Sequence, residues 1–284
     1  MGNKKIYIHI GHGKTGSTAI QCFLAQNSKN LSLNKILYHN PGTKEFSNAL
    51  KNKINSGNID PNNDWINDHV LTVIEKNPDY EKYIFSNENL FHNLKPFIDY
   101  IKNEGKNNLY EFVIILCVRN PIEMLLCEYN QNIKREGYYE NLTKFFLEKK
   151  FTCTHTSKSR NIIKKLETLK EKNLLFNYSW EKSNIIKSLS KKLDIFDISR
   201  FDIIAEKIIN RSLTNHELLL VRFINKFYGK NIGSKIADKI VDYINSPIKK
   251  EKFEFDNKLI KKIKENNIKN IRFLNRRIPK EKNL

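Results

Sequence analysis

The hydrophobic pattern alternates between short segments typical of strands and longer segments with helical spacing. Phe112–Val118 is a continuous apolar run, which is typical of a parallel strand covered on both faces. Shorter runs rich in β-branched and aromatic residues predict further strands at Lys5–Ile10, Lys82–Ser86 and Leu174–Tyr178. Strands that alternate with helices indicate an α/β fold, in which helices flank both faces of a central parallel sheet.

Helices are predicted between these strands and over most of the C-terminal part. Apolar spacing places them at Ala19–Gln26, Lys44–Ile54, Trp65–Glu75, Lys95–Lys102, Ile122–Lys134 and Glu217–Phe227. Pro121 suits the first position of the helix that follows it. The polar stretch Asn27–Asn63 is otherwise predicted to be loop-rich, and from about residue 183 the pattern is mostly helical. A chain of 284 residues suits one domain, 1–284, with a helical C-terminal part.

The composition argues against several classes of protein and several kinds of site. The longest purely apolar run has seven residues, against about 20 for a membrane helix, so we expect no membrane span. The apolar segment Ile6–Ile10 is too short and too polar for a signal peptide, which favours a cytoplasmic protein. Four cysteines without a CxxC pair indicate neither a zinc site nor a disulfide framework.

The net charge of +19 leaves two interpretations open. A strongly basic chain suits nucleic acid, an anionic membrane or a polyanionic substrate. However, 41 of the 50 basic residues are Lys and they are scattered, as expected from a compositional bias with solvated side chains. The acid-poor stretch Phe151–Lys165, which contains Lys158, Arg160, Lys164 and Lys165, is a candidate wall of an acceptor groove.

A glycine-rich turn joins the first predicted strand to the first predicted helix. Gly11, Gly13 and Gly16 allow the backbone to approach an anion closely, and the first helical turn adds free N–H groups and the positive end of the helix dipole. Lys14 supplies a mobile cation, while Ser17 and Thr18 supply hydroxyl donors. The pattern predicts an anion site, although a glycine-rich turn by itself can be only a turn.

This loop differs from the phosphate-binding loop of NTPases. The pattern GxxxxGK[ST] requires Lys after its second glycine, where this chain has Ser17; the lysine stands inside the loop, as Lys14. The strongest strand ends in Arg119 instead of a carboxylate that holds magnesium. Arg119 lies where open α/β sheets bind ligands, and it predicts a second anion site.

Two motifs resemble those of sulfotransferases that use 3′-phosphoadenosine 5′-phosphosulfate (PAPS). HIGHGKTGSTAIQ, at 9–21, is similar to the 5′-phosphosulfate loop of bacterial glycan-type members, HIGxxKTGTTxIQ. Arg119, Pro121, Cys127 and Tyr129 are similar to the 3′-phosphate motif RxPxxxxxSxY. The resemblance is good over 5–21 and 117–134, weaker at 86–90 and faint at 209–225. It implies a P-loop-like fold, a carbohydrate acceptor, 3′,5′-ADP as product and no metal.

The resemblance also implies residue roles. Lys14 would contact the bridging oxygen of the phosphosulfate, and the 5′-phosphate would be held by Gly13, Thr15, Gly16, Ser17 and Thr18. Arg119 would bind the 3′-phosphate with help from position 127. The family has serine there, and because the thiol of Cys127 is a weak donor, Asn130, Gln131 and Lys134 are candidates to compensate.

Transfer to a hydroxyl needs a general base, for which Glu88 is the candidate. Glu88 follows the strand Lys82–Ser86 in a segment that resembles the family's SSExL, where glycan-type members carry a catalytic carboxylate. Burial would raise its pKa, and His92 would face it if the segment is a helix. Alternatively, Glu88 only stabilises a helix start, and His12 is the substitute base.

Two other functions compete with this interpretation. A small-molecule or nucleotide kinase is disfavoured by the misplaced lysine. A nucleic-acid-binding protein would owe its binding to charge alone, because no helix-turn-helix, RNP or zinc-finger pattern is present, and we expect no nucleic-acid partner.

Overall fold

The structure is a computed structural model of the whole chain. It describes residues 4–62, 64–104, 109–148, 154–169, 172–181, 184–193, 195, 212–243 and 257–284. The chain forms two compact units. The first contains Met1–Arg119, Lys158–Ile209 and Leu274–Leu284, and the second contains Asn120–Ser157 and Asn210–Phe273.

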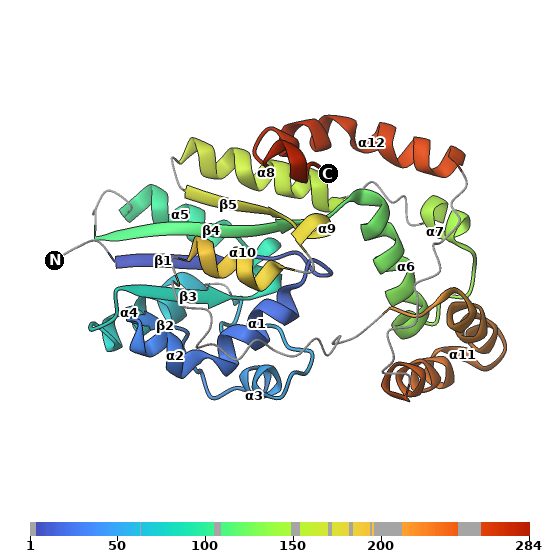
Figure 1. Cartoon of the computed structure of the whole chain (residues 1–284), viewed down its shortest axis with the longest axis horizontal. Coiled ribbons are helices and arrows are strands. Elements are labelled where there is room, and N and C mark those ends of the chain that lie inside the picture. Colours follow the sequence, from blue (N-terminus) through green and yellow to red (C-terminus); the bar gives the residue numbers. More distant parts are fainter. Residues whose placement is uncertain are drawn as a thin grey trace. The chain divides into compact units, whose positions relative to one another are not determined.

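A parallel sheet is the centre of the first unit (Figure 1). Its described strands are β1 (Lys4–His9), β2 (Ile36–Leu37), β3 (Lys82–Ser86), β4 (Tyr110–Val118) and β5 (Lys172–Asn177), in the order β2-β3-β1-β4-β5. Every neighbouring pair is parallel, with Ile8 opposite both Phe85 and Ile114. The α/β class predicted from the sequence is confirmed.

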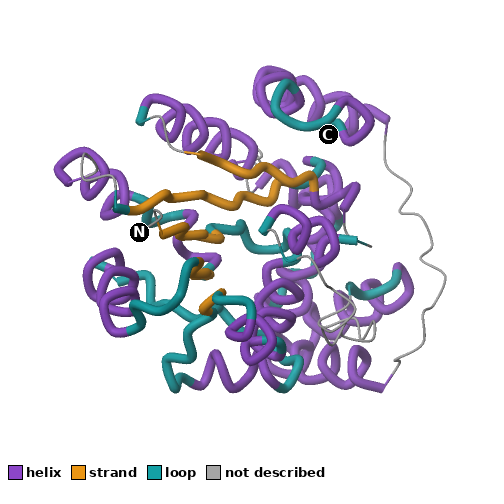
Figure 2. Tube along the Cα trace, turned by 60° about the vertical axis from the view of Figure 1, so that its left-hand side comes forward, coloured by secondary structure: helices purple, strands orange, loops and turns teal. Residues whose placement is uncertain are grey.

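Helices cover both faces of this sheet because side chains alternate along each strand. On one face, Val113, Ile115 and Cys117 of β4 share a core with residues of α1 (Ser17–Gln26), α2 (Ser28–Leu33), α3 (Lys44–Leu50) and α10 (Ile185–Lys192). On the other face, the ring of Phe112 lies 5.3 Å from that of Phe97 on α5 (Lys95–Glu104). The buried residues of β4 therefore belong to a strand enclosed between two helical layers, as Figure 2 shows.

Several observed elements differ from the predicted ones. Trp65–Glu75 is a π-helix, η1 (Ile66–Leu71), followed by α4 (Thr72–Lys76). The helix that begins at Lys44 ends at Leu50 instead of Ile54, because the chain turns at Asn52, whose φ is 53°. The stretch predicted to be loop-rich also contains α2 and the two-residue strand β2, which is too short to produce a hydrophobic pattern.

The second unit is helical where it is described. It contains α6 (Pro121–Glu136), α7 (Leu142–Glu148), α11 (Asn215–Tyr243) and most of α12 (Asn257–Asn275), which share an apolar core. Pro121 is in the first turn of α6, as predicted, and the Asn120 side chain caps this helix by accepting a hydrogen bond from the N–H of Ile122. Gly229 interrupts α11 with a φ of 78°.

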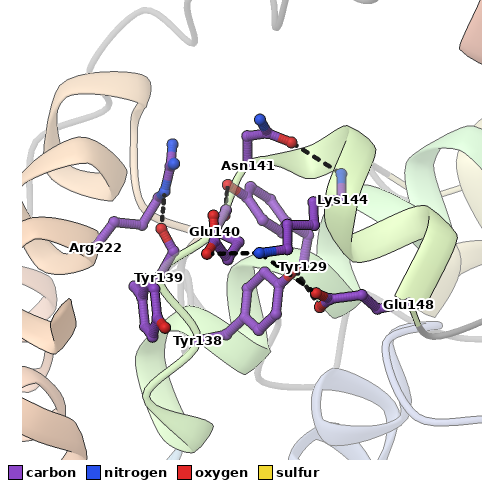
Figure 3. A network of polar contacts seen from close by, with 8 residues as sticks. All are labelled: Tyr129, Tyr138, Tyr139, Glu140, Asn141, Lys144, Glu148 and Arg222. Atoms are coloured by element: carbon purple, nitrogen blue, oxygen red, sulfur yellow. Dashed lines mark hydrogen bonds and ion pairs between the residues drawn. The ribbon is translucent and has the colours of Figure 1, made fainter.

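A polar network joins the end of α6, the next turn, α7 and α11 (Figure 3). Its residues are Tyr129, Tyr138, Tyr139, Glu140, Asn141, Lys144, Glu148 and Arg222. The Lys144 ammonium lies 2.8 Å from a carboxylate oxygen of Glu140, and Arg222 donates to the Tyr139 carbonyl oxygen. Because the network satisfies backbone and side-chain groups within the unit, its part is structural.

Three remaining elements of the first unit matter for the site. The 3₁₀ helix η2 (Glu88–Phe91) follows β3, α8 (Thr154–Thr168) precedes β5, and α9 (Tyr178–Glu181) follows β5. A further 3₁₀ turn, η4 (Lys280–Lys282), lies near the C-terminus. Within the described ranges, none of the helices has the length and apolar character that a bilayer crossing requires.

Candidate active site

The glycine loop joins β1 to α1, as the sequence predicts. Gly16 is the N-cap of α1 with a φ of 87°, and neither a side-chain cap nor an acidic residue occupies the first turn. Lys14 also has a positive φ, 70°, which is unfavourable for a residue with a side chain. The loop therefore presents uncapped N–H groups and the positive end of a ten-residue helix at one place.

A buried hydroxyl lies beside this helix start. Ser17 is 2 % exposed, and its Oγ has no hydrogen-bond partner among the residues that the structure describes. A Cβ at Gly11 would overlap this Oγ and lie 2.6 Å from His9 Nε2, so only glycine fits there. Buried hydroxyls are normally paired, and this one is therefore a candidate donor to a ligand oxygen.

The two threonines of the loop differ in their surroundings. The hydroxyl of Thr15, which is fully buried, donates to the carbonyl oxygen of His12 and so braces the loop. Thr18 is half-buried in the first turn of α1. Any contact of Thr15 with a ligand in this geometry is through its backbone N–H.

Glu88 lies next to the loop, at the start of η2. Its Oε2 would be 3.9 Å from a Cβ at Gly13. Burial raises the pKa of Glu88 above its ordinary value, while the nearby ammonium of Lys14 opposes that rise. The side chain that caps η2 is that of Asn87, which accepts from the N–H of Asn89. The cap of this turn is thus supplied without the Glu88 carboxylate.

Side chains that the sequence analysis did not single out hold the end of β3. The Asn58 amide accepts from the N–H of Ser86, and Gln21 donates to the Ser86 hydroxyl at 3.1 Å. His9 Nδ1 lies 2.8 Å from the same hydroxyl, and burial lowers the pKa of His9 to about 4, so its ring is neutral. These contacts fix the end of β3, two residues before Glu88, against β1 and α1. Nothing in the sequence marked Asn58 as a residue of the site, because it lies in an asparagine-rich stretch.

His92 lies between His12 of the glycine loop and Lys158 of α8. The rings of His12 and His92 are 6.1 Å apart, and His92 accepts a hydrogen bond from the Lys158 ammonium, 3.1 Å away. Burial lowers the pKa of His12 to about 4, whereas it raises the pKa of Glu88. No contact between His92 and Glu88 is observed: a 3₁₀ turn aligns residues three apart, so Phe91 shares the side of Glu88.

Arg119 contacts the loop itself. Its Nη1 donates to the carbonyl oxygen of Lys14 at 2.8 Å, and its guanidinium lies over the ring of Tyr178, 5.2 Å from the centroid. A Cβ at Gly16 would overlap the same ring. Tyr178 therefore packs between the two predicted anion-binding segments. Sequence reasoning placed it at a strand end on this edge of the sheet but assigned it no role.

The second predicted motif lies partly in the other unit. Cys127 is a half-buried free cysteine on α6, and its part in binding a 3′-phosphate stays a prediction. Asn130 is not available to assist, because its side chain both donates to and accepts from the backbone of Leu213. Among the residues that are described, no three His, Cys, Asp or Glu side chains are grouped as a metal site would require.

Comparisons with known proteins give limited guidance. No protein-family model and no curated protein matches the chain. Two solved structures of retinol dehydratase are similar over 95% of this chain and 82% of theirs. One holds retinol and PAP, with 12% identity and a TM-score of 0.35; the other holds androsterone and the inactive cofactor PAP, with 11% identity and a TM-score of 0.33. At TM-scores below 0.5, these likenesses do not establish a common fold.

Proposed function

We propose that this protein is a PAPS-dependent sulfotransferase that transfers a sulfuryl group to a hydroxyl of a carbohydrate. One observation carries the proposal: Lys14 and the half-buried Glu88 lie together at the uncapped start of α1. A cation and a carboxylate of raised pKa at a helix N-terminus suit displacement at an anionic centre. The carbohydrate acceptor rests on the resemblance of residues 9–21 to the glycan-type loop.

The residues fit the donor PAPS. The N–H groups of Gly16, Ser17 and Thr18 and the unpaired Ser17 hydroxyl would hold the 5′-phosphate. The Arg119 guanidinium would bind the 3′-phosphate, because a planar fork of donors suits phosphate. Its hydrogen bond to the Lys14 carbonyl oxygen links this contact to the loop.

The two charged groups divide the chemistry. PAPS supplies the sulfuryl group. Glu88 accepts the proton of the acceptor hydroxyl as that oxygen forms its bond to sulfur, and the bond between sulfur and the 5′-phosphate oxygen breaks. The Lys14 ammonium balances the negative charge that the leaving oxygen acquires. Glu88 is the preferred candidate because burial raises its pKa and lowers that of His12.

Calorimetric titration with PAP (3′,5′-ADP), ATP and magnesium-ATP tests the class of enzyme. We expect PAP to bind in the absence of metal, and PAPS to donate sulfate to a hydroxylated acceptor. Lys14→Ala should lower transfer about a hundredfold to a thousandfold while PAP still binds. Substitution of Lys29, an exposed lysine on α2, by Ala should leave both unchanged. Magnesium-dependent turnover of ATP without binding of PAP would show a kinase instead.

A further inference from the structure

A groove opens beside the candidate active site, within the first unit. It has a volume of about 560 Å³, in the range of ligand sites, and is lined by residues of η2, α5 and α8 and by His92. Figure 1 labels α5 and α8. Its apolar floor consists of Phe91, Leu94, Ile98, Ile162 and Leu169. Asn161 and Thr168 add hydrogen-bonding groups to the wall.

Four lysines stand along this groove. Lys95 and Lys102 belong to α5, and Lys158 and Lys165 belong to α8, while Asp99 is the one acidic residue of the lining. We call the groove that these four residues line the lysine groove. Lys95, Lys102 and Lys165 form no ion pair with another described residue. The groove therefore carries an excess of positive charge that this part of the chain does not neutralise.

The lysines are spaced alike on both walls. Each pair is seven residues apart, so its members share one face of their helix and stand about 10 Å apart along its axis. Two cationic positions, one near each end of the groove, suit a ligand with anionic groups at more than one point along its length. A single small anion would leave one end of the groove unpaired.

One end of the groove lies near the glycine loop and Glu88. Lys158 donates to His92 Nδ1, and the His92 ring is 6.1 Å from that of His12, the neighbour of Gly13. Phe91 and His92, which are three and four residues after Glu88, line the groove. A long acceptor lying on α5 and α8 would thus extend toward the proposed base.

We propose that the lysine groove binds the acceptor, and that this acceptor is an acidic oligosaccharide bearing carboxylate or sulfate groups. The proposal rests on the proposed function, whose acceptor it specifies. Hydrogen-bonding and apolar lining suits a sugar chain, and the lysines suit its anionic groups. A single-stranded nucleic acid is disfavoured because it requires exposed aromatic platforms, whereas Phe91, the groove's one Phe, Tyr or Trp, is 3 % exposed.

The groove also explains part of the sequence pattern. Lys158 and Lys165 come from the acid-poor stretch Phe151–Lys165, so two of its four basic residues line a groove. Arg160 and Lys164 do not line it.

The test compares two oligosaccharides of equal length on the whole protein. A hyaluronan hexasaccharide carries carboxylates and chitohexaose is neutral, and binding of each is measured by calorimetry at low and high salt. We expect the acidic sugar alone to bind measurably, with an affinity that falls as salt rises. The double variant Lys102→Gln, Lys165→Gln should weaken binding of the acidic sugar about fivefold to tenfold, since each substitution removes one exposed charge of the groove.

A matched control removes the same charge elsewhere. Lys191→Gln with Lys192→Gln lies on α10, whose exposed lysines lie outside the groove, and should leave affinity for the acidic sugar unchanged. Equal binding of the two sugars, equal losses in the two double variants, or tighter binding of a thymidine hexanucleotide would overturn the proposal. Titration of PAP into the same samples separates the two ideas, because PAP binding without sugar preference refutes only the groove.

Discussion

Lys14 is expected to stabilise the leaving oxygen, and its positive φ is expected to lower the stability of the fold. Two substitutions separate these two effects. Its φ of 70° costs a residue with a Cβ about 1–2 kcal/mol, which glycine does not pay. Glycine loses about 0.4–1 kcal/mol through the greater entropy of the unfolded chain. Lys14→Gly should therefore be about 0.5–1 kcal/mol more stable than Lys14→Ala.

Activity should follow the ammonium group instead of the backbone. Both variants lose the charge that stabilises the leaving oxygen, so transfer from PAPS should fall about a hundredfold to a thousandfold in each. Urea unfolding of the unliganded protein measures the stability difference, and sulfate transfer measures the chemistry.

Lys35 provides the matched control. It is an exposed lysine with a φ of 58°, placed between α2 and β2. Lys35→Gly and Lys35→Ala should differ in stability in the same sense, with transfer unchanged. If Lys14→Ala kept full activity, Lys14 would have no part in the chemistry. If Lys14→Gly were no more stable than Lys14→Ala, the argument from backbone strain would fail.

Three further predictions concern Glu88 and Arg119 of the candidate site and the buried His9 beside it. Glu88→Gln should abolish transfer while leaving PAP binding intact. Because burial raises the pKa of Glu88 above 4.5, kcat of the unmodified enzyme should fall as the pH is lowered and Glu88 becomes protonated. A kcat that does not change as the pH is lowered would exclude Glu88 as the base. Arg119→Ala should weaken PAP about tenfold to a hundredfold and 5′-AMP far less, as titrations would show; equal losses would contradict a 3′-phosphate contact. His9 binds its proton at a pKa of about 4 when folded and 6.5 when unfolded, so falling pH favours the unfolded chain across that window. The free energy of unfolding should drop by about 3 kcal/mol more in the unmodified protein than in His9→Gln between pH 7 and pH 4, and identical pH profiles would show that His9 titrates normally.

The hydrophobic pattern predicted the strands well, because a strand that is buried on both faces needs apolar residues at consecutive positions. The bounds of Lys82–Ser86 match β3, and Phe112–Val118 falls within β4. The π-helical turn at Ile66–Leu71 was predicted as α-helix, because apolar spacing over a single turn does not distinguish the two hydrogen-bond registers. β2 escaped prediction because two residues have no measurable period.

The candidate site was predictable where its residues are consecutive in the sequence. The glycines, Lys14 and the start of α1 are consecutive, so the sequence contains the whole loop. Tyr178 was missed because an aromatic residue at a strand end signals packing as well as function. Its contact with Arg119 and its overlap with any side chain at Gly16 join segments that are far apart in sequence.

The order of residues by itself determined that a strand, a glycine turn and a helix follow one another with a lysine inside the turn, and it predicts that this loop binds an anion. Only the tertiary structure decided that burial raises the pKa of Glu88 and lowers that of His12, and that four lysines from two helices line one groove. The physical reason is that helix and turn preferences depend on neighbours along the chain. A pKa and a charged groove depend instead on burial and on distances between segments that only folding brings together.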